Sequence, residues 1–184
     1  LISGPTAIEP PMFVNVIPII SAQEMFEKVA TNATENDIII KAAAVADYRP
    51  KEVCDEKIKK SDHDTEIELE RTTDILAYLG KNKGKTFLCG FSMETENMLE
   101  NSRRKLDKKN LDMIVANNLK TAGAGFGTDT NVITIITKDS EQAFDLMSKA
   151  QAADCILDAI CEQKNQNPLL ADAMECRLHS NSVR

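Results

Sequence analysis

The sequence predicts an α/β fold of three layers, in which one open and mostly parallel sheet lies between helices and a small β element carries a flap. Two observations favour this class. Short apolar runs rich in β-branched residues, which are typical of strands buried on both faces, recur along the chain. Amphipathic helical patterns separate these runs, and such an alternation of strand and helix indicates a parallel sheet.

Composition and charge are those of an ordinary globular domain of 184 residues, with 42% apolar and 28% charged residues. No apolar run approaches the roughly 20 residues that cross a membrane, so a membrane partner is not expected. The formal net charge of −7 argues against nucleic acid as a partner. The five cysteines form no CxxC pair and the two histidines stand far apart, which predicts no structural metal site and a reducing, cytoplasmic location.

The first elements are expected within the first 32 residues. Residues 1–6 resemble the end of a strand that runs into a loop, and we expect the chain to be a fragment or a trimmed piece of a longer protein. Residues 13–20 alternate loosely and indicate a second strand, broken by a proline. Ser21 and Glu24 form a capping-box pattern, which predicts a helix that ends near Asn32.

The segment 37–60 (DIIIKAAAVADYRPKEVCDEKIKK) organises the predicted site. Its isoleucines, 38–40, predict a strand buried on both faces, and the small side chains at 42–44 allow a ligand to approach closely. Asp47 lies where such a ligand would sit, because ligands of open α/β sheets bind beyond the carboxyl ends of the strands. Pro50 is expected to prevent further regular strand pairing.

A lysine cluster, Lys57, Lys59 and Lys60, follows after a polar link. Taken singly, the lysines could be a solvated charge run, and Asp47 could be only a turn or cap residue. Taken together, an acid at a strand end and a tethered group of lysines suggest a polyphosphate site beneath a lysine-bearing flap, since lysine serves as a movable point charge for phosphate.

The remaining elements follow from the same patterns. Residues 66–70 alternate charged and apolar side chains and predict a half-exposed strand, and Thr73 and Asp74 cap a short helix that closes at Gly80. Further strands are expected at 86–91, 112–116 and 132–137, further helices at 95–109 and 141–162, one domain over residues 1–163, and a partly disordered tail at 164–184.

The predicted helix at 95–109 has a dense basic face, formed by Arg103, Arg104, Lys105, Lys108 and Lys109. Like charges four residues apart cost a few tenths of a kcal/mol, roughly. A surface helix tolerates that cost, whereas a bound anion would explain it, and both interpretations remain open at this point.

Residues 123–127 (GAGFG) resemble a dinucleotide-binding fingerprint only superficially. The glycines precede the predicted strand at 132–137 and not a helix, so the context that this motif requires is absent. We therefore interpret them as a flexible loop and disfavour a Rossmann oxidoreductase.

Seven motifs, in a fixed order, resemble the phosphopantothenoylcysteine synthetase (phosphopantothenate–cysteine ligase) family. They are SGPT, AAAVADYRP, KIKK, TDIL, GFSMET, RRKLDKKNLDMIVAN and GFGTDTN. The resemblance covers residues 1 to about 160 and implies a Rossmann-like sheet. In bacteria this enzyme is often the C-terminal half of a bifunctional coenzyme A biosynthesis protein, so the resemblance also implies a possible fusion to a flavin-dependent decarboxylase domain.

The resemblance implies a ligase that joins 4′-phosphopantothenate to cysteine. Bacterial members use CTP and human-type members use ATP, so CTP with Mg²⁺ is expected here. The carboxylate is first converted to an acyl-cytidylate, and the cysteine amine then displaces the nucleotide. The work of the protein is positioning and charge neutralisation.

Site residues are also implied by the resemblance. Lys57 matches the lysine of the KxKK motif that assists acyl-nucleotidylate formation, and is the expected catalytic residue. Thr72 and Thr73 replace an Asn-Pro common in the family, which weakens the expected contact with the pyrimidine. The residues expected to bind nucleotide are Ala42, Ala43, Asp47, Lys57, Thr73, Asp74, Ile75, Leu76, Phe91, Lys105 and Lys109, and those expected to bind the acid substrate are Ala43 and Ala44.

One departure from the family is expected to matter. The family's N-terminal strand, its glycine-rich loop and an asparagine used in the cysteine step are not in this chain. Family members are dimers with shared sites, so the resemblance implies a homodimer through the β element at 50–70. The alternative hypothesis is a catalytically incomplete nucleotide-binding or dimerisation fragment.

Overall fold

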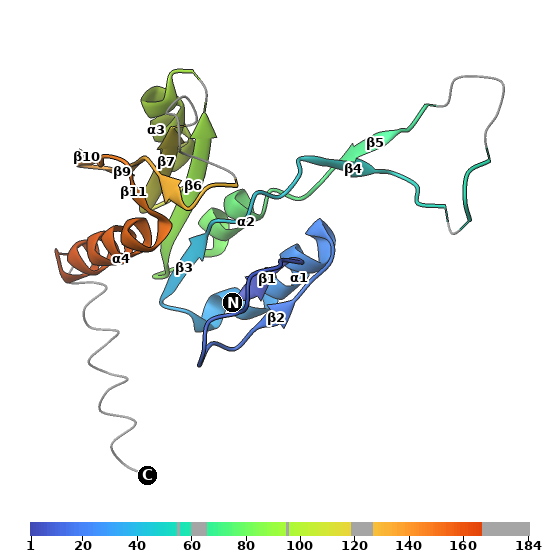
Figure 1. The fold of residues 1–184 in the computed structure, drawn as a ribbon, viewed down its shortest axis with the longest axis horizontal. Helices are drawn as coiled ribbons and strands as arrows, with labels where there is room; N and C mark the ends of the chain where they lie inside the picture. Colours follow the sequence, from blue (N-terminus) through green and yellow to red (C-terminus); the bar gives the residue numbers. More distant parts are fainter. Residues whose placement is uncertain (55, 60–65, 95, 119–126, 167–184) are drawn as a thin grey trace, which may run out of the picture.

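A central sheet of five strands forms the body of the molecule in a computed structural model (Figure 1). The structure describes residues 1–54, 56–59, 66–94, 96–118 and 127–166. The strand order is β10-β9-β7-β6-β3. Strand β6 pairs in parallel with β3 and with β7, whereas β9 pairs antiparallel with β7 and with β10. Their bounds are β3 Ile38–Lys41, β6 Phe87–Glu94, β7 Met113–Asn118, β9 Ile133–Thr137 and β10 Glu141–Ala143.

Helices cover both faces of this sheet, which confirms the predicted three-layer α/β class. One core joins the sheet to α1 (Ala22–Asn32), α2 (Ile75–Asn82) and α3 (Met98–Lys108). A second core joins the opposite face to α4 (Lys149–Gln166). Alternate residues of each strand enter opposite cores, as the two-residue period of a strand requires; Leu88 belongs to the first core and Cys89 to the second.

Helix α1 begins as its capping box predicts. The backbone N–H of Glu24 donates to Ser21 Oγ at 3.2 Å, and the Glu24 carboxylate accepts from the backbone N–H of Ile20 at 2.9 Å. These contacts satisfy donors that the first turn of a helix leaves unpaired. A short 3₁₀ turn, η1 (Ala33–Glu35), then leads to β3.

The expectation of a single helix over residues 141–162 is wrong for its first turns. Glu141–Ala143 instead pairs with β9 as β10, and β11 (Met147–Ser148) pairs with β8 (Thr130–Asn131). Helix α4 begins only at Lys149, where the Gln151 N–H donates to Ser148 Oγ and the Gln151 side chain accepts from the Ser148 N–H. This Ser-x-x-Gln capping box is the start signal that the sequence interpretation missed.

Helix α2 does not close at Gly80, which corrects the expected boundary, because the helix continues to Asn82. Gly80 has a different role. A Cβ at this position would lie 1.7 Å from the backbone oxygen of Lys109, so only glycine lets α2 lie against the end of α3. The Asn110 side chain then donates to the Gly80 carbonyl at 2.8 Å.

A two-stranded arm extends away from the sheet (Figure 1) and consists of β4 (Tyr48–Pro50) and β5 (Leu69–Arg71) in antiparallel pairing. The strand expected at 66–70 therefore begins later, at Leu69, whereas β4 ends at Pro50, as expected. Backbone bonds join Thr72 to Asp47 and Lys51 to Glu68, which places Pro50 at an alternate, outward-facing position. Its missing N–H costs the ladder no hydrogen bond.

Strand β3 is less buried than the sequence predicts. It was expected to be covered on both faces, but Ile38 and Ile40 are 37% and 40% exposed. The reason is topological: β3 is the terminal strand of the described sheet, and α4 covers only the strands farther in. The pair β1 (Ile2–Ser3) and β2 (Ile17–Pro18) forms a separate parallel sheet.

Within the described ranges, none of the helices is both long and apolar enough to cross a membrane. The tail expected from residue 164 begins inside α4, which runs to Gln166, and residues 167–184 lie outside the described part of the chain. The glycine loop at 123–127 also falls outside it, except for Gly127.

Candidate functional site

The candidate site begins at the carboxyl end of β3. The chain leaves the sheet at Lys41 and continues through exposed small residues, Ala42, Ala43 and Ala44. The Nζ of Lys41 donates to the carbonyl of Ala43, two residues further along the chain, at 2.7 Å. An ammonium group therefore stands at the strand end where ligands of open α/β sheets bind.

The arm brings two acids to the same strand end. The Thr72 N–H donates to the Asp47 carbonyl at 3.0 Å, and the Thr72 hydroxyl donates to the Ala46 carbonyl. Two residues on, Asp74 is the N-cap of α2, where its Oδ1 accepts from the Ala77 N–H at 3.0 Å. The backbone pairing at the base of the arm thus fixes Asp47 beside the start of α2.

Lys109, which caps the C-terminal end of α3, completes the group. Its Nζ lies 3.0 Å from Asp74 Oδ2 and 3.2 Å from Oδ1. The close contact of Gly80 with the Lys109 backbone holds the two helix ends together. We call Lys41, Asp47, Asp74 and Lys109 the strand-end cluster.

The pKa values of the strand-end cluster reflect mutual electrostatic contact. Burial lowers the pKa of Lys41 and the positive charge of Lys109 lowers it further, while Asp74 and Asp47 act in the opposite direction. Burial would raise the pKa of Asp74, but the hydrogen bonds from Ala77 and Lys109 outweigh it, and the pKa is lowered overall. Lys41 therefore lies within electrostatic reach of the other three charges.

A second ion pair lies at the carboxyl end of β6. Lys105 contacts the Glu94 carboxylate and, at 3.5 Å, the Ser92 hydroxyl. Burial would raise the pKa of Glu94, but hydrogen bonds from Lys105, Ser92 and Asn101 and the charge of Lys105 lower it overall. Lys105 and Lys109 lie one helical turn apart on α3, so the two pairs occupy neighbouring strand ends.

Ion pairs with acidic side chains involve three residues of the basic face of α3. Lys109 faces Asp74, Lys105 faces Glu94, and Arg103 lies 2.7 Å from Glu141. Acidic partners from three other elements therefore offset much of the like-charge repulsion along α3.

The other expected nucleotide contacts are only partly brought together. Thr73 is exposed beside Asp74, but the side chains of Ile75 and Leu76 are buried in the first core, which leaves only their backbone for a ligand. Phe91 packs against the second core, on the face of the sheet that α4 covers. The structure thus separates Phe91 from the strand-end cluster.

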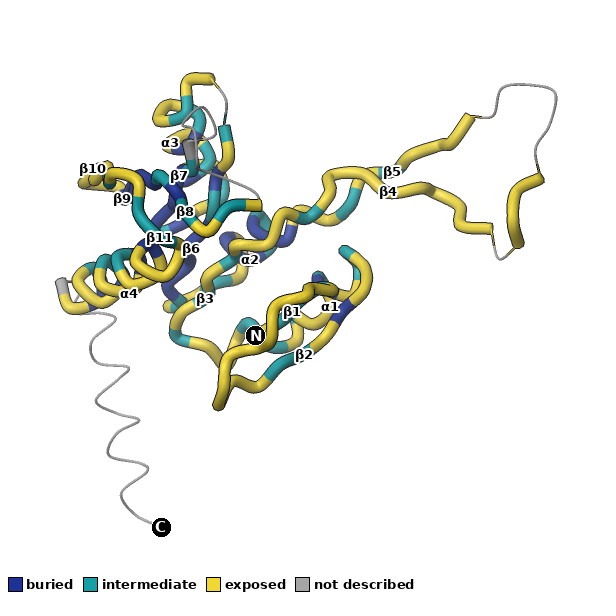
Figure 2. The backbone as a smooth tube through the Cα atoms, viewed as in Figure 1, coloured by how far each residue is buried: buried dark blue, intermediate teal, exposed yellow. Residues whose placement is uncertain are grey.

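Lys57 stands apart from all of these residues. It is exposed and lies in the arm segment that continues beyond β4 away from the sheet (Figure 2). Its neighbour Lys59 is exposed as well, whereas Lys60 lies outside the described residues. Within one copy of the chain, the described part of the flap extends away from the main sheet (Figure 1).

Sequence analysis missed Lys41, the lysine nearest to the strand end. Its position directly after three isoleucines was an available signal, because the residue that ends a parallel strand lies at the ligand-binding edge. The pairing of Lys109 with Asp74 carried no such signal, since the two residues are 35 positions apart in the sequence.

A metal centre built by the protein alone is not supported by the donor set. Within the described residues, no group of three or more His, Cys, Asp or Glu side chains could hold a metal ion. Mg²⁺ commonly uses one or two carboxylates together with substrate phosphates, and the exposed acids of the strand-end cluster suit that role.

Fold and site together define an α/β protein of the open-sheet class with charged side chains gathered at the carboxyl ends of parallel strands, where ligands of this class bind. The chain belongs to the family described as the DNA/pantothenate metabolism flavoprotein C-terminal domain, which matches residues 1–163. This bears out the family resemblance of the sequence motifs.

Curated relatives support the assignment. The coenzyme A biosynthesis bifunctional protein CoaBC of Bacillus subtilis is 45% identical over 168 residues, which is 90% of this chain and 41% of that protein. A cysteine/cysteine sulfinic acid decarboxylase of an unknown prokaryotic organism is 45% identical over 87% of this chain and 45% of its own length. The chain thus spans less than half the length of these relatives.

Solved structures agree with the fold. The crystal structure of the C-terminal domain of CoaBC is 42% identical, with a TM-score of 0.75, over 90% of this chain and 76% of that chain. The DNA/pantothenate metabolism flavoprotein from Streptococcus pneumoniae is only 20% identical, over 88% of this chain and 79% of that one, and its TM-score of 0.72 supports the fold alone.

Proposed function

We propose that this chain is the ligase part of a coenzyme A biosynthesis protein and condenses 4′-phosphopantothenate with cysteine at the expense of CTP. The observation that carries the proposal is the strand-end cluster, where two ammonium groups and two carboxylates meet at the ligand-binding edge of the sheet. The names of the CoaBC relatives support the pathway, and the KxKK and ADYRP motifs support the reaction.

The proposed chemistry has two displacements. A carboxylate oxygen of phosphopantothenate attacks the α-phosphorus of CTP, the bond to the β-phosphate oxygen breaks, and pyrophosphate leaves. The cysteine amine then attacks the acyl carbon, loses a proton, and CMP leaves. Both steps need negative charge to be neutralised on phosphate, which is what positioned ammonium groups supply.

Four residues receive roles from their positions. Lys109 and Lys41 would bind the phosphates, with Asp74 holding Lys109 in place until the nucleotide arrives. Asp47 would bind the ribose or base through its exposed carboxylate. Mg²⁺ would arrive with the triphosphate and bridge it to the acids of the cluster.

We further propose that Lys57 acts in the site of a second copy of the chain. An arm that points away from its own sheet can deliver Lys57 to the site of a partner, so the proposed enzyme is a homodimer. Exposed apolar side chains on the arm support this: Val53, Ile58 and Ile67 are 84%, 62% and 67% exposed. Exposed apolar side chains on one arm favour a surface that another protein covers.

Titration calorimetry with CTP and with ATP tests nucleotide binding. We expect CTP to bind more tightly than ATP, Lys109→Met to weaken CTP binding about tenfold, and the exposed neighbour Lys108→Met to leave it unchanged. If CTP does not bind, or if both variants behave alike, the strand-end cluster is not the nucleotide site.

A second candidate function is a nucleotide-binding or dimerisation domain without complete catalysis. The observation that favours it is the direction of the arm, whose described residues extend away from the main sheet (Figure 1). A coupled assay of pyrophosphate release with CTP and phosphopantothenate separates the two: the ligase releases pyrophosphate, whereas the incomplete domain binds CTP without doing so.

A further inference from the structure

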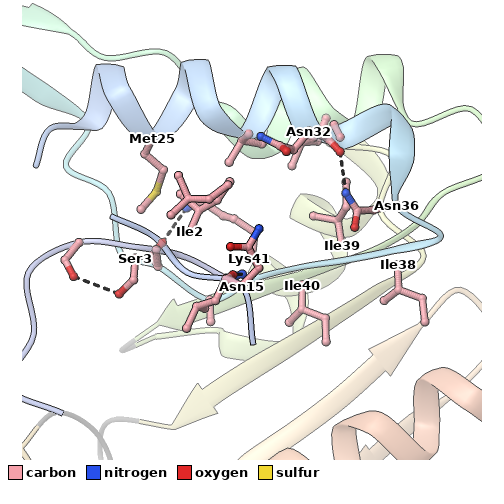
Figure 3. Close-up of a pocket in the computed structure, with 18 residues that line it drawn as sticks. Ile2, Ser3, Asn15, Met25, Asn32, Asn36, Ile38, Ile39, Ile40 and Lys41 are labelled. Carbon is pink, nitrogen blue, oxygen red and sulfur yellow. Dashed lines mark hydrogen bonds between the residues drawn. The ribbon is translucent and has the colours of Figure 1, made fainter. Parts of the chain in front are cut away.

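Three ammonium groups follow one another along the carboxyl ends of β3 and β6. Lys41 ends β3, where it lines a pocket beside that strand (Figure 3). The positive charge of Lys109 acts on the pKa of Lys41, so these two ammonium groups are electrostatic neighbours. Lys105 lies one helical turn before Lys109, at a spacing that puts side chains on the same face of a helix. The row of ammonium groups therefore runs from the end of β3 to the end of β6.

Glu94, the last residue of β6, faces the end of this row. Its Oε1 accepts hydrogen bonds from Lys105 and, at 3.4 Å, from the Ser92 hydroxyl, and its Oε2 accepts from the Asn101 side chain at 3.4 Å. Asn101 is itself held in place, because its side chain also donates to the Glu96 carbonyl at 3.0 Å. Both carboxylate oxygens therefore have partners, which come from β6 and α3.

Within the pair of Glu94 and Lys105, the lysine is the movable partner. The Glu94 side chain is 18% exposed, whereas that of Lys105 is 42% exposed. The pair of Lys109 with Asp74 shows the opposite distribution, with the lysine 23% and the acid 52% exposed. An ammonium group on a flexible four-carbon stem can change its partner without any movement of the helix that carries it. Lys105 can therefore leave the carboxylate for an anion that arrives from solvent.

We propose that Glu94 is a positioning residue, which holds Lys105 beside the phosphate site and weakens the binding of pyrophosphate so that this product can leave. This role rests on the proposed function, in which the first displacement releases pyrophosphate. A polyphosphate anion among the three ammonium groups must take Lys105 from Glu94 and must also approach a further negative charge. Both effects lower its affinity, and a neutral side chain at this position would remove them.

Release of pyrophosphate matters because the cysteine amine attacks after it has formed. The acyl-cytidylate and pyrophosphate share the site once the first displacement is complete, and retained pyrophosphate would reverse that step. Product release limits the rate of many enzymes. A fixed carboxylate at the end of the row favours dissociation of pyrophosphate, the more highly charged of the two products, and affects the acyl-cytidylate less because that intermediate carries a single phosphate.

Titration calorimetry with inorganic pyrophosphate, at constant ionic strength, tests this role. We expect Glu94→Gln to bind pyrophosphate about fivefold more tightly than the unmodified protein, because the amide carries no charge. Glu141→Gln is the matched control: it removes a carboxylate that pairs with Arg103 of the same helix from β10, at the opposite edge of the sheet, and is expected to leave the affinity unchanged.

The direction of the change separates positioning from a merely structural role. If Glu94 only supported the fold, Glu94→Gln would bind pyrophosphate more weakly. Weaker or unchanged binding in this variant therefore overturns the proposal. Equal tightening by Glu141→Gln overturns it as well, and so does the absence of pyrophosphate binding in both Glu94→Gln and the unmodified protein.

A double substitution shows whether Glu94 acts through Lys105. When Lys105→Met is already present, we expect Glu94→Gln to tighten pyrophosphate binding by about twofold at most, because the competition for the ammonium group is gone and only the repulsion remains. A gain that stays as large as in the protein with Lys105 intact would contradict the positioning role.

The same measurements distinguish failure of this role from failure of the proposed function. If CTP binds and Lys109→Met weakens its binding, but Glu94→Gln leaves the pyrophosphate affinity unchanged, the ligase proposal stands and the role of Glu94 falls. If Glu94→Gln binds pyrophosphate more tightly as expected, but the unmodified protein releases none from CTP and phosphopantothenate, the ligase proposal falls and the control of polyphosphate affinity by Glu94 stands.

Discussion

The side chain of Lys41, at the end of β3, is central to the electrostatics of the strand-end cluster. It is half-buried, it bonds its own chain through Ala43, and it lies within reach of both acids and of Lys109. Two ammonium groups so close together repel each other in the absence of an anion. A phosphate between them would relieve that repulsion, which makes Lys41 more consequential for ligand affinity than for folding.

We expect Lys41→Met to weaken CTP binding about tenfold without lowering the melting temperature. The physical reason is that the substitution removes a positive charge from the proposed phosphate site while retaining the apolar stem of the side chain. Calorimetry and thermal unfolding measure the two effects. Lys81→Met, on the exposed surface of α2, is the matched control, and an unchanged CTP affinity in Lys41→Met removes Lys41 from the site.

Lys57 is expected to act on catalysis alone. Its exposure predicts no effect of Lys57→Gln on the fold, whereas its proposed role at the α-phosphate predicts at least a hundredfold slower pyrophosphate release. The assay uses the full-length enzyme. Lys59→Gln, two residues further along the same exposed segment, is expected to retain most activity; unaltered pyrophosphate release by Lys57→Gln refutes the role.

The free energy of unfolding at acidic pH is expected to depend on Glu94. Its pKa in the folded protein lies below the ordinary value of 4.5, so the folded state binds this proton less readily than the unfolded state. The resulting stabilisation is complete above about pH 4.5 and is lost as the pH falls through the folded-state pKa. Urea unfolding across this pH range should therefore show a smaller loss of stability on acidification in Glu94→Gln than in the unmodified protein. If the free energy of unfolding falls equally with pH in both proteins, Glu94 does not contribute in this way.

At the scale of secondary-structure elements, the contact between α2 and α3 positions the site. Gly80 touches the Lys109 backbone, so that contact also sets the distance between Lys109 and Asp74. We expect Gly80→Ala to destabilise the fold by about 2 kcal/mol or more, because a methyl group cannot fit against backbone atoms. Chemical denaturation measures this. Gly4→Ala, whose Cβ would meet its nearest atom at 3.8 Å, is the control, and equal stabilities of the two variants contradict the assignment.

The elements themselves were largely predictable, because hydrophobic period and caps are local signals. The capping box at Ser21 and the cap at Asp74 were correctly placed from sequence. Residues 141–148 were not, because Glu141–Ala143 pairs with β9 in a hairpin connected by residues 138–140, and this pairing overrides a helical pattern. Gly80 misled in a similar way: a glycine near a helix end suggests a stop, and only the packed structure reveals that it permits a close approach.

The site was predictable in part for the same reason. Of the residues that the family resemblance implies, Asp74 pairs with Lys109, and Asp47 acts with both on the pKa of Lys41. The acids that face the basic helix could not be found from sequence, because their contacts depend on sheet order. The direction of the arm could not be found either, since a polar link of uncertain shape separates Lys57 from its strand.

At the scale of the whole molecule, the exposed apolar arm predicts association. We expect sedimentation to find a dimer, and Ile58→Asp combined with Ile67→Asp to shift it to a monomer while the circular dichroism of the body is retained. These two side chains lie on the arm and contribute nothing to either core. Ile8→Asp, an equally exposed isoleucine near the other sheet, is the control; a monomeric unmodified protein contradicts the shared site.

Pro50 gives the arm a further property. Because the proline occupies an outward-facing position of the β4 ladder, the outer edge of this ribbon lacks a backbone donor there. A long apolar ribbon would otherwise offer a template on which chain after chain could stack into fibres. The proline interrupts that template but leaves the apolar side chains available to a partner. The arm can therefore bind one neighbouring chain and still resist polymerisation.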